Sequence, residues 1–285
     1  MNLRTIIFIV ALLLFVGTPT FAADTTPPSL TAKAYAVYGW KNGVPTPLYV
    51  KNENTLYPVA SITKLITAKA VEALYPSYML FAMTPTTLAT DGSIKGMVAR
   101  SQFTRDDLLK ALLIPSSNDA AMAFMDPVGQ KKFLATMNTI LHEEKYTTTS
   151  FVNPSGLDPT SKKIAPNRLT PYHISALLSD IYQHDPVLTA IMGEADATIT
   201  DLYHHTTITL RQSDGLYLDD TYKGRVIIGK TGFTNLAGQN LAFITQGNDT
   251  YDYITIVVMH SKDRVKDSEK VLDWLDALQQ PAYGG

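Results

Sequence analysis

Apolar residues near the start of the chain alternate with small side chains in two short runs. Residues 34–40 form the first run and residues 47–50 the second. This period of two is typical of β-strands, whose successive side chains point to opposite faces. Asn42-Gly43 lies between the runs, and both residues tolerate positive φ. We therefore expect a β-hairpin here.

The middle of the chain changes to the period of amphipathic helices. One helix is predicted to begin near Ser61. Thr104 with Asp107 resembles a capping box, and it opens a helix that Pro115 ends. Further helices are predicted at about residues 120–125, 131–143 and 170–182, the last opened by an N-cap threonine and a first-turn proline.

The pattern returns to strands near the C-terminus. Residues 225–228, 240–245 and 251–259 are rich in β-forming side chains, and a final amphipathic helix is predicted at about residues 265–278. Strands at both ends with helices between them indicate an α/β (α+β) fold. We expect one five-stranded antiparallel sheet flanked by helices, with an all-helical subdomain inserted.

These predictions divide the chain into parts. Residues 23–60 and 205–285 are assigned to the sheet-containing subdomain and residues 61–204 to the helical one, together forming one domain. Residues 1–22 have the pattern of an export signal, because Arg4 precedes an apolar run at residues 6–16 and small residues follow it. The run is shorter than the roughly 20 residues that a membrane-spanning helix needs. We expect cleavage after Ala22 and an exported protein; an uncleaved anchor is the alternative.

Composition narrows the function classes. The chain has 24 basic and 26 acidic residues, which disfavours a nucleic-acid-binding protein. It has no cysteine, so no disulfide stabilises it. The pair His204-His205 has no convincing further ligands nearby in sequence, and we predict no metal site.

Three short strings of polar residues have the chemistry of acyl transfer. They are Ser61-Ile62-Thr63-Lys64, Ser116-Ser117-Asn118 and Lys230-Thr231-Gly232. Ser61 and Lys64 would lie on one face of a helix, one turn apart. A serine hydroxyl needs a neighbour to accept its proton, and a lysine can do so when burial or a second cation lowers its pKa. Each string alone is a weak signal, and their order and spacing give them weight.

The residues around these strings resemble the low-molecular-mass penicillin-binding proteins, which are D-alanyl-D-alanine carboxypeptidases and endopeptidases of the bacterial envelope. The similarity covers about residues 32–278, nearly all of the chain beyond the expected export signal. The matching segments are residues 58–68, 112–121, 153–158 and 229–238.

The resemblance implies a DD-peptidase-like fold, which is also that of the β-lactamases, and a serine mechanism on peptidoglycan stem peptides. Ser61 would be the nucleophile and Lys64 the general base, with Ser116 relaying a proton and Asn118 holding Lys64 in place. The implied substrate-binding residues are Lys230, Thr231, Gly232 and Phe233. Backbone N–H groups of Ser61 and Phe233 would form the oxyanion hole.

The same resemblance implies that no metal or cofactor is needed and that β-lactam antibiotics acylate Ser61. It also implies a bacterial periplasm or cell wall as the location. We expect no C-terminal membrane anchor, because the chain stops soon after its last predicted helix.

Three alternatives stay open. A class A β-lactamase would use a glutamate between the second and third strings, but residues 145–193 contain none. An endopeptidase that cuts peptide cross-links would use the same groups as the carboxypeptidase, and the short C-terminus resembles members of that kind. A catalytically inactive peptidoglycan-binding domain would lack one of the polar residues, and none is missing.

Overall fold

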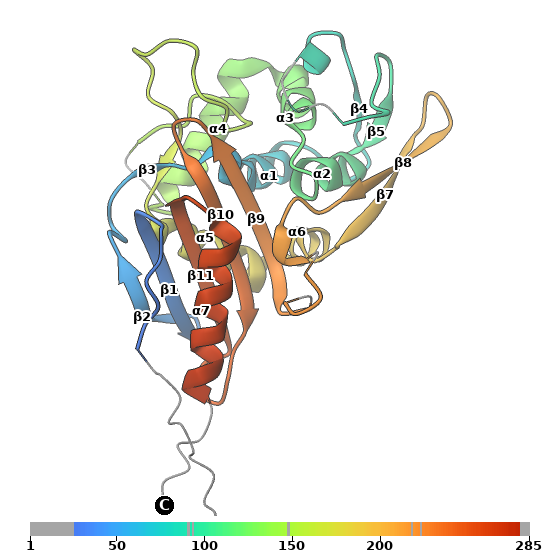
Figure 1. The fold of residues 1–285 in the computed structure, drawn as a ribbon. Helices are drawn as coiled ribbons and strands as arrows, with labels where there is room; N and C mark the ends of the chain where they lie inside the picture. The colour runs from blue at the N-terminus through green and yellow to red at the C-terminus, as the bar shows by residue number, and fades with distance from the viewer. Residues whose placement is uncertain are drawn as a thin grey trace, which may run out of the picture.

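Five antiparallel strands form the sheet on which the fold is built (Figure 1). The computed structural model describes residues 26–89, 92, 94–146, 149–217, 219–222 and 224–279, so the expected export signal lies outside it. The sheet order is β2-β1-β11-β10-β9, which confirms the predicted five-stranded α+β fold. The strands are β1 (Ala34–Lys41), β2 (Val44–Lys51), β9 (Val226–Thr234), β10 (Gly238–Gln246) and β11 (Tyr253–Ser261).

The first and the last strand of the described chain lie side by side in the centre of this sheet. β1 pairs with β11 from Ala34 opposite Met259 to Trp40 opposite Tyr253. β1 and β2 are joined by the predicted turn, in which Asn42 and Gly43 have φ values of 50° and 76°. The hairpin prediction is confirmed at both residues.

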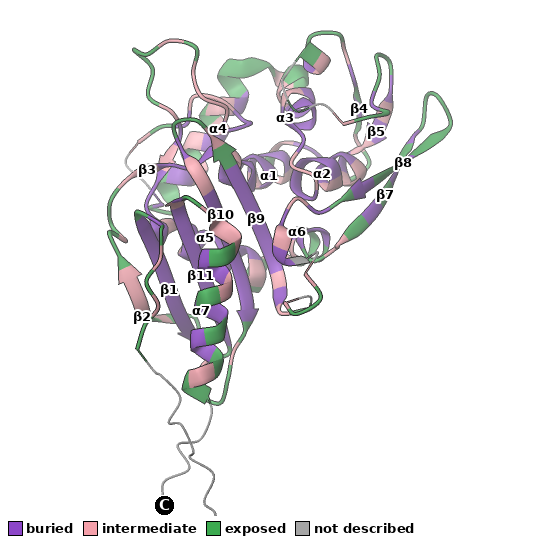
Figure 2. Ribbon diagram, viewed as in Figure 1, coloured by how far each residue is buried: buried purple, intermediate pink, exposed green. Residues whose placement is uncertain are grey.

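Helices cover both faces of the sheet, which is why its central strands are buried almost without interruption (Figure 2). On one face, α7 (Arg264–Gln279) buries Val271, Leu272 and Trp274 against the strands. On the other face, α5 (Pro171–His184) packs against β1, β10 and β11. The sequence of a central strand that is covered on both faces is a continuous apolar run rather than an alternation of apolar and polar residues.

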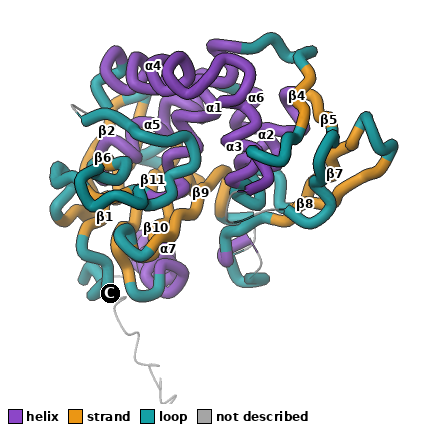
Figure 3. The backbone as a smooth tube through the Cα atoms, turned by 90° about the horizontal axis from the view of Figure 1, so that it is seen from above, coloured by secondary structure: helices purple, strands orange, loops and turns teal. Residues whose placement is uncertain are grey.

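In the view of Figure 1, the remaining helices lie above the sheet and beyond its β9 edge (Figures 1 and 3). They are α1 (Thr63–Leu74), α2 (Arg105–Leu113), α3 (Asn118–Met125), α4 (Gly129–Glu143) and α6 (Pro186–Met192). The predicted caps are confirmed: the Thr104 side chain accepts a hydrogen bond from Asp107 N at 3.2 Å, and that of Thr170 from His173 N at 3.1 Å. No helix within the described part of the chain is long and apolar enough to cross a membrane.

Three small two-stranded sheets were not predicted. They pair β3 (Tyr57–Pro58) with β6 (Arg168–Leu169), β4 (Leu80–Ala82) with β5 (Gln102–Thr104), and β7 (Asp196–Asp201) with β8 (Thr206–Arg211). The first two are too short to produce a periodic pattern. β7 does alternate exposed and buried residues, and the prediction missed it. The expected subdomain boundary at residues 204 and 205 falls in the turn of the β7–β8 hairpin.

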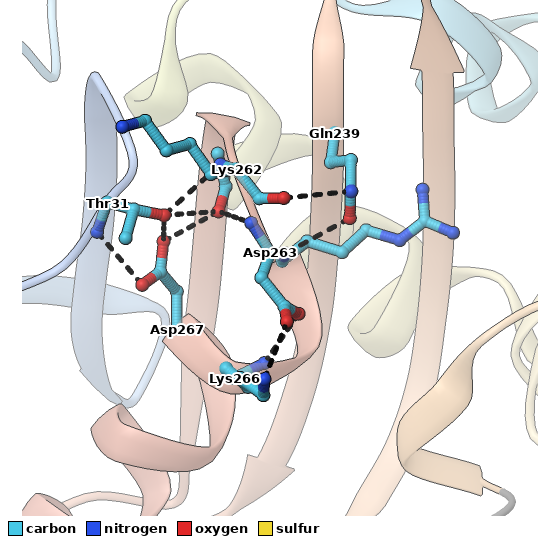
Figure 4. Close-up of polar contacts among 8 residues, drawn as sticks. Thr31, Gln239, Lys262, Asp263, Lys266 and Asp267 are labelled. Carbon is cyan, nitrogen blue, oxygen red and sulfur yellow. Dashed lines mark hydrogen bonds and ion pairs between the residues drawn. The ribbon is translucent and has the colours of Figure 1, made fainter.

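The start of α7 is fixed by a buried carboxylate (Figure 4). Asp267 accepts hydrogen bonds from Thr31 N, Thr31 Oγ1, Ala32 N and Ser261 Oγ, at 2.6–2.9 Å. The side chain of Gln239 adds two contacts, donating to Lys262 O and accepting from Arg264 N. These bonds fasten the first turn of α7 to β10 and β11, and so position Arg264.

Candidate active site

The segment that contains Ser61 is a tight turn between the sheet and α1. Residues Ala60–Ile62 form one turn of 3-10 helix (η1), and α1 follows directly. Ala60 has a φ of 49°, in the left-handed region that a non-glycine residue seldom adopts. Such backbone persists only where its surroundings fix it. Here Val59 N donates to Asn167 O, and Asn240 Nδ2 donates to Pro58 O at 3.1 Å.

Lys64 is the centre of the site. It is fully buried, and its Nζ atom lies 2.7 Å from Ser61 Oγ, 2.7 Å from Asn118 Oδ1 and 2.9 Å from Ser155 O. The amide oxygen of Asn118 and the carbonyl oxygen of Ser155 can only accept hydrogen bonds. A neutral lysine amine would satisfy both with its two N–H groups, leaving its lone pair for the hydroxyl proton of Ser61. All three contacts are therefore compatible with Lys64 acting as a base.

Electrostatics favours this neutral form. Burial lowers the pKa of Lys64 well below its ordinary value, because the charged form loses its hydration. The positive charge of Lys230 lowers the pKa of Lys64 further. A lowered pKa is what a lysine needs to accept a proton near neutral pH.

The second string lies on the connection between α2 and α3. Ser116 has a φ of 67°, and Ser117 caps α3 by accepting a hydrogen bond from Ala120 N at 3.1 Å. Asn118, the first residue of α3, reaches Lys64. The buried Ser116 Oγ makes no hydrogen bond with any described residue. Lys64 is thus in contact with Ser61 and Asn118, but the structure forms no bond between Ser116 and either Ser61 or Lys64.

The third string lies on β9, the edge strand beside η1. Lys230 is fully buried, and its Nζ atom donates only to Thr231 O, at 3.3 Å, among the described residues. Burial and the nearby Arg264 lower the pKa of Lys230 to about 7, although Asp214 opposes this shift. The hydroxyl of Thr231 is hydrogen-bonded to that of Ser213 at 2.7 Å.

Gly232 is the point at which β9 touches the Ser61 turn. A Cβ atom at this position would lie 2.7 Å from Val59 O, closer than real Cβ atoms approach, and a tight 3.2 Å from Ser61 N. Only glycine therefore lets the strand lie against the backbone of Ser61. Phe233 follows it, and its side chain is 61% exposed at the rim of the site. The three sequence strings thus converge on one place.

The loop of residues 153–158 was noticed for its resemblance, but none of its residues was predicted to be part of the site. Ser155 supplies the third oxygen at Lys64. The turn is built by Asn153, whose Oδ1 atom accepts from Gly156 N at 2.6 Å and whose Nδ2 atom donates to Leu157 O at 2.9 Å. The Asn-Pro-Ser-Gly composition predicts such a turn. A backbone carbonyl, however, has no signature in a sequence.

The same loop is fastened to the β9–β10 hairpin. Asp158 Oδ1 accepts from Thr234 Oγ1 at 2.7 Å, and Asp158 Oδ2 accepts from Leu236 N at 3.0 Å. Leu236 is 51% exposed, close in sequence to the exposed Phe233. Asp158 therefore joins the loop of residues 153–158 to the β9–β10 hairpin along one rim of the site.

Two further charged residues accompany Lys230. Arg264 donates from a guanidinium nitrogen to Gly232 O at 3.2 Å. Asp214 is 1% exposed, and its Oδ1 atom accepts from Leu216 N at 3.0 Å. The sequence patterns single out neither residue, and Arg264 lies just before the final helix predicted at about residues 265–278.

Among the residues that the structure describes, no group of three or more His, Asp or Glu side chains could hold an ion. His204, in the β7–β8 turn, is instead paired through Nδ1 with Asp201 at 2.7 Å.

Comparison with known proteins places this geometry in a family. The model of the D-alanyl-D-alanine carboxypeptidase family of peptidases matches residues 22–263. The chain is 28% identical over 242 residues to a D-alanyl-D-alanine endopeptidase of Pseudomonas aeruginosa, covering 82% of this chain and 74% of that one. It is 30% identical over 281 residues to the D-alanyl-D-alanine carboxypeptidase DacC of Escherichia coli, covering 92% of this chain and 66% of that one.

Solved structures agree on the fold. A D-alanyl-D-alanine carboxypeptidase from Mycobacterium tuberculosis superposes with a TM-score of 0.77 at 22% identity, over 93% of this chain and 99% of that one. A Streptomyces DD-transpeptidase superposes with a TM-score of 0.74 at 23% identity, over 88% of this chain and 99% of that one.

Proposed function

This chain belongs to the D-alanyl-D-alanine carboxypeptidase family of serine peptidases, and from that premise we propose that Ser61 is its nucleophile and Lys64 its general base. The family membership makes it a hydrolase of the DD-peptidase class. The observation that carries the proposal is the set of three oxygen atoms around the buried Nζ of Lys64, of which only Ser61 Oγ can donate a proton.

In the proposed acylation, Lys64 takes the hydroxyl proton while Ser61 Oγ bonds to the carbonyl carbon between the two terminal D-alanines. The carbon–nitrogen bond then breaks, and the proton passes to the leaving amine by way of Ser116. The unbonded Ser116 hydroxyl supports this role, since it has no competing partner among the described residues. Water then attacks the ester, and Ser61 recovers its proton.

Negative charge develops on the carbonyl oxygen during attack. We propose that the N–H groups of Ser61 and Phe233 stabilise it as an oxyanion hole. The close approach of Gly232 to Ser61 N supports this, because it brings the end of β9 against the nucleophile turn.

The substrate's terminal carboxylate is proposed to bind at Lys230 and Thr231. An extended peptide would lie along β9, whose outer edge is not paired with another strand of the five-stranded sheet. β-Lactam antibiotics would occupy the same place and acylate Ser61.

We propose peptidoglycan stem peptides as the substrate and carboxypeptidase action as the principal activity. Endopeptidase action on cross-links is the second candidate, and it has support because the relatives include D-alanyl-D-alanine endopeptidases of three organisms. Export through residues 1–22 to a periplasm or cell wall follows from the substrate, since peptidoglycan lies outside the cytoplasm.

The test is to incubate the protein with monomeric pentapeptide and with cross-linked muropeptide dimers, and to identify the products by mass spectrometry. Release of free D-alanine alone supports carboxypeptidase action, and separation of dimers into monomers supports endopeptidase action. Ser61→Ala should abolish both, while Ser77→Ala, at an exposed position, should change neither. If the folded wild-type protein forms neither product, the proposed function is contradicted.

A further inference from the structure

A buried acidic residue lies against β9, next to the residue that precedes Lys230. Asp214 comes from the segment before η4 (Gly215–Tyr217), Lys230 from β9 and Arg264 from the first turn of α7. Asp214 and Lys230 are almost completely buried, at 1% and 0% exposure. A buried carboxylate usually has hydrogen-bond partners for both oxygens. Asp214 has a partner for Oδ1 only.

The free oxygen faces β9. Asp214 Oδ2 lies 3.1 Å from the position that a Cβ atom would occupy at Gly229, the residue before Lys230. Glycine at 229 thus leaves room for a carboxylate against the strand. Because Oδ2 makes no hydrogen bond among the described residues, its interaction with this part of the site is through charge.

The charges around Asp214 are few and can be named. Asp214 is attracted by Arg264 and by Lys230. The charge of Arg264 lowers the pKa of Lys230, and the charge of Asp214 raises it. The charge of Lys230 in turn lowers the pKa of Lys64. The charges of Asp214 and of the more exposed Asp263 both favour the charged form of Arg264. Two cations crowded into a buried site would tend to lose one proton without a neighbouring anion.

We propose that Asp214 is a positioning residue that keeps Lys230 protonated beside Arg264, so that both cations are available to the substrate carboxylate. Asp214 itself does not contact the reacting atoms. The kinetic part of this inference rests on the proposed function.

The titration of these groups gives the inference a recognisable pH signature. Burial raises the pKa of Asp214 to about 6, although Leu216 N and the two cations oppose this. Below about pH 6 the wild-type carboxyl is therefore neutral, as an asparagine would be. Above it, the wild type has an anion beside Lys230 and an Asp214→Asn variant does not.

The direct test is a titration of the lysine side chains followed by NMR of ¹³Cε-labelled lysine, with the Lys230 signal assigned by its loss in Lys230→Met. In Asp214→Asn the midpoint of Lys230 should fall by about one pH unit, the effect of losing a nearby opposite charge. Asp263→Asn is the matched control, because it removes an anion near Arg264 that is less buried, and the Lys230 midpoint should not move. An unchanged Lys230 midpoint in folded Asp214→Asn would overturn the proposal.

The kinetic test compares KM for a D-Ala-D-Ala peptide across pH. Below about pH 6, KM should be the same in the wild type and in Asp214→Asn. At pH 8, KM of the variant should exceed that of the wild type by up to about tenfold, and kcat should change less. A shifted Lys230 midpoint with an unchanged KM profile would overturn the link to carboxylate binding. Lack of any hydrolysis by wild type would instead contradict the proposed function, and the NMR result would stand.

Folding is checked by thermal unfolding of Asp214→Asn and of Asp214→Ser, which can still accept the bond from Leu216 N. Both are expected to fold, because Oδ2 has no hydrogen-bond partner to lose. If neither folds, Asp214 is a structural residue and the inference is wrong.

Discussion

Gly156 packs against the backbone of Ala60, the residue before the proposed nucleophile. A Cβ atom on Gly156 would lie 1.9 Å from Ala60 O and 2.8 Å from Thr63 Oγ1, and Gly156 itself has a φ of 84°. The loop that supplies Ser155 O to Lys64 is thus pressed directly onto the turn that holds Ser61.

This contact predicts that Gly156→Ala lowers the free energy of unfolding by more than about 3 kcal/mol, because the clash adds to the backbone strain. Gly224 is a matched control, since it has the same φ of 84° and nothing within 4 Å. Gly224→Ala should lower the free energy of unfolding by the backbone strain alone, about 1–2 kcal/mol. Urea unfolding measures both, and equal losses would show that the contact with Ala60 is unimportant.

Lys64 is predicted to be essential as a base. Lys64→Met should lower the rate of acylation by penicillin by about 10²–10⁴-fold. Lys64→Arg should be equally impaired, because a guanidinium stays protonated and cannot accept the proton of Ser61. Lys132→Met, at an exposed position of α4, should keep the wild-type rate. A Lys64→Arg variant with near-normal acylation would exclude the base role.

The pH dependence should be bell-shaped for a peptide with a free terminal carboxylate. Activity requires Lys64 neutral, so kcat/KM should rise with pH through the lowered pKa of Lys64. It also requires Lys230 charged, so kcat/KM should fall as pH rises through about 7, the pKa of Lys230. With the C-terminally amidated peptide, the fall above pH 7 should disappear. If the amidated peptide shows the same fall, Lys230 does not recognise the carboxylate.

Asp158 is predicted to hold the rim of the site together. Asp158→Ala removes the acceptors of Thr234 Oγ1 and Leu236 N. Amide hydrogen exchange should therefore speed up in both residues 153–157 and residues 234–237. Asp219→Ala is the control, since among the described residues the Asp219 carboxylate accepts only from Thr221 N, within its own turn. If exchange speeds up on one side only, the loop and the hairpin are not coupled through Asp158.

Local signals in the sequence were sufficient for the main elements of the fold. Thr104, Thr170 and Asn42-Gly43 act within a few residues of themselves, and the structure confirms each one. β7 and β8 were not predicted, although β7 alternates exposed and buried residues. The three polar strings could be predicted to meet because their order and neighbours matched a family.

The rest of the site depends on contacts between distant segments. Ser155 contributes through its backbone carbonyl, which any residue possesses. Asp214 and Arg264 are 50 positions apart in the sequence, and they act on Lys230 only because η4, β9 and α7 pack together. Neither kind of contribution follows from residue type or spacing.

The central claim is that Ser61 is the residue that becomes acylated. Intact-mass measurement after treatment with benzylpenicillin tests it, followed by peptide mapping of the adduct. The wild-type protein and Ser77→Ala should each gain the mass of one penicillin on the peptide that contains Ser61, and Ser61→Ala should gain none. An adduct that persists in Ser61→Ala, or no adduct on the folded wild-type protein, would contradict the account.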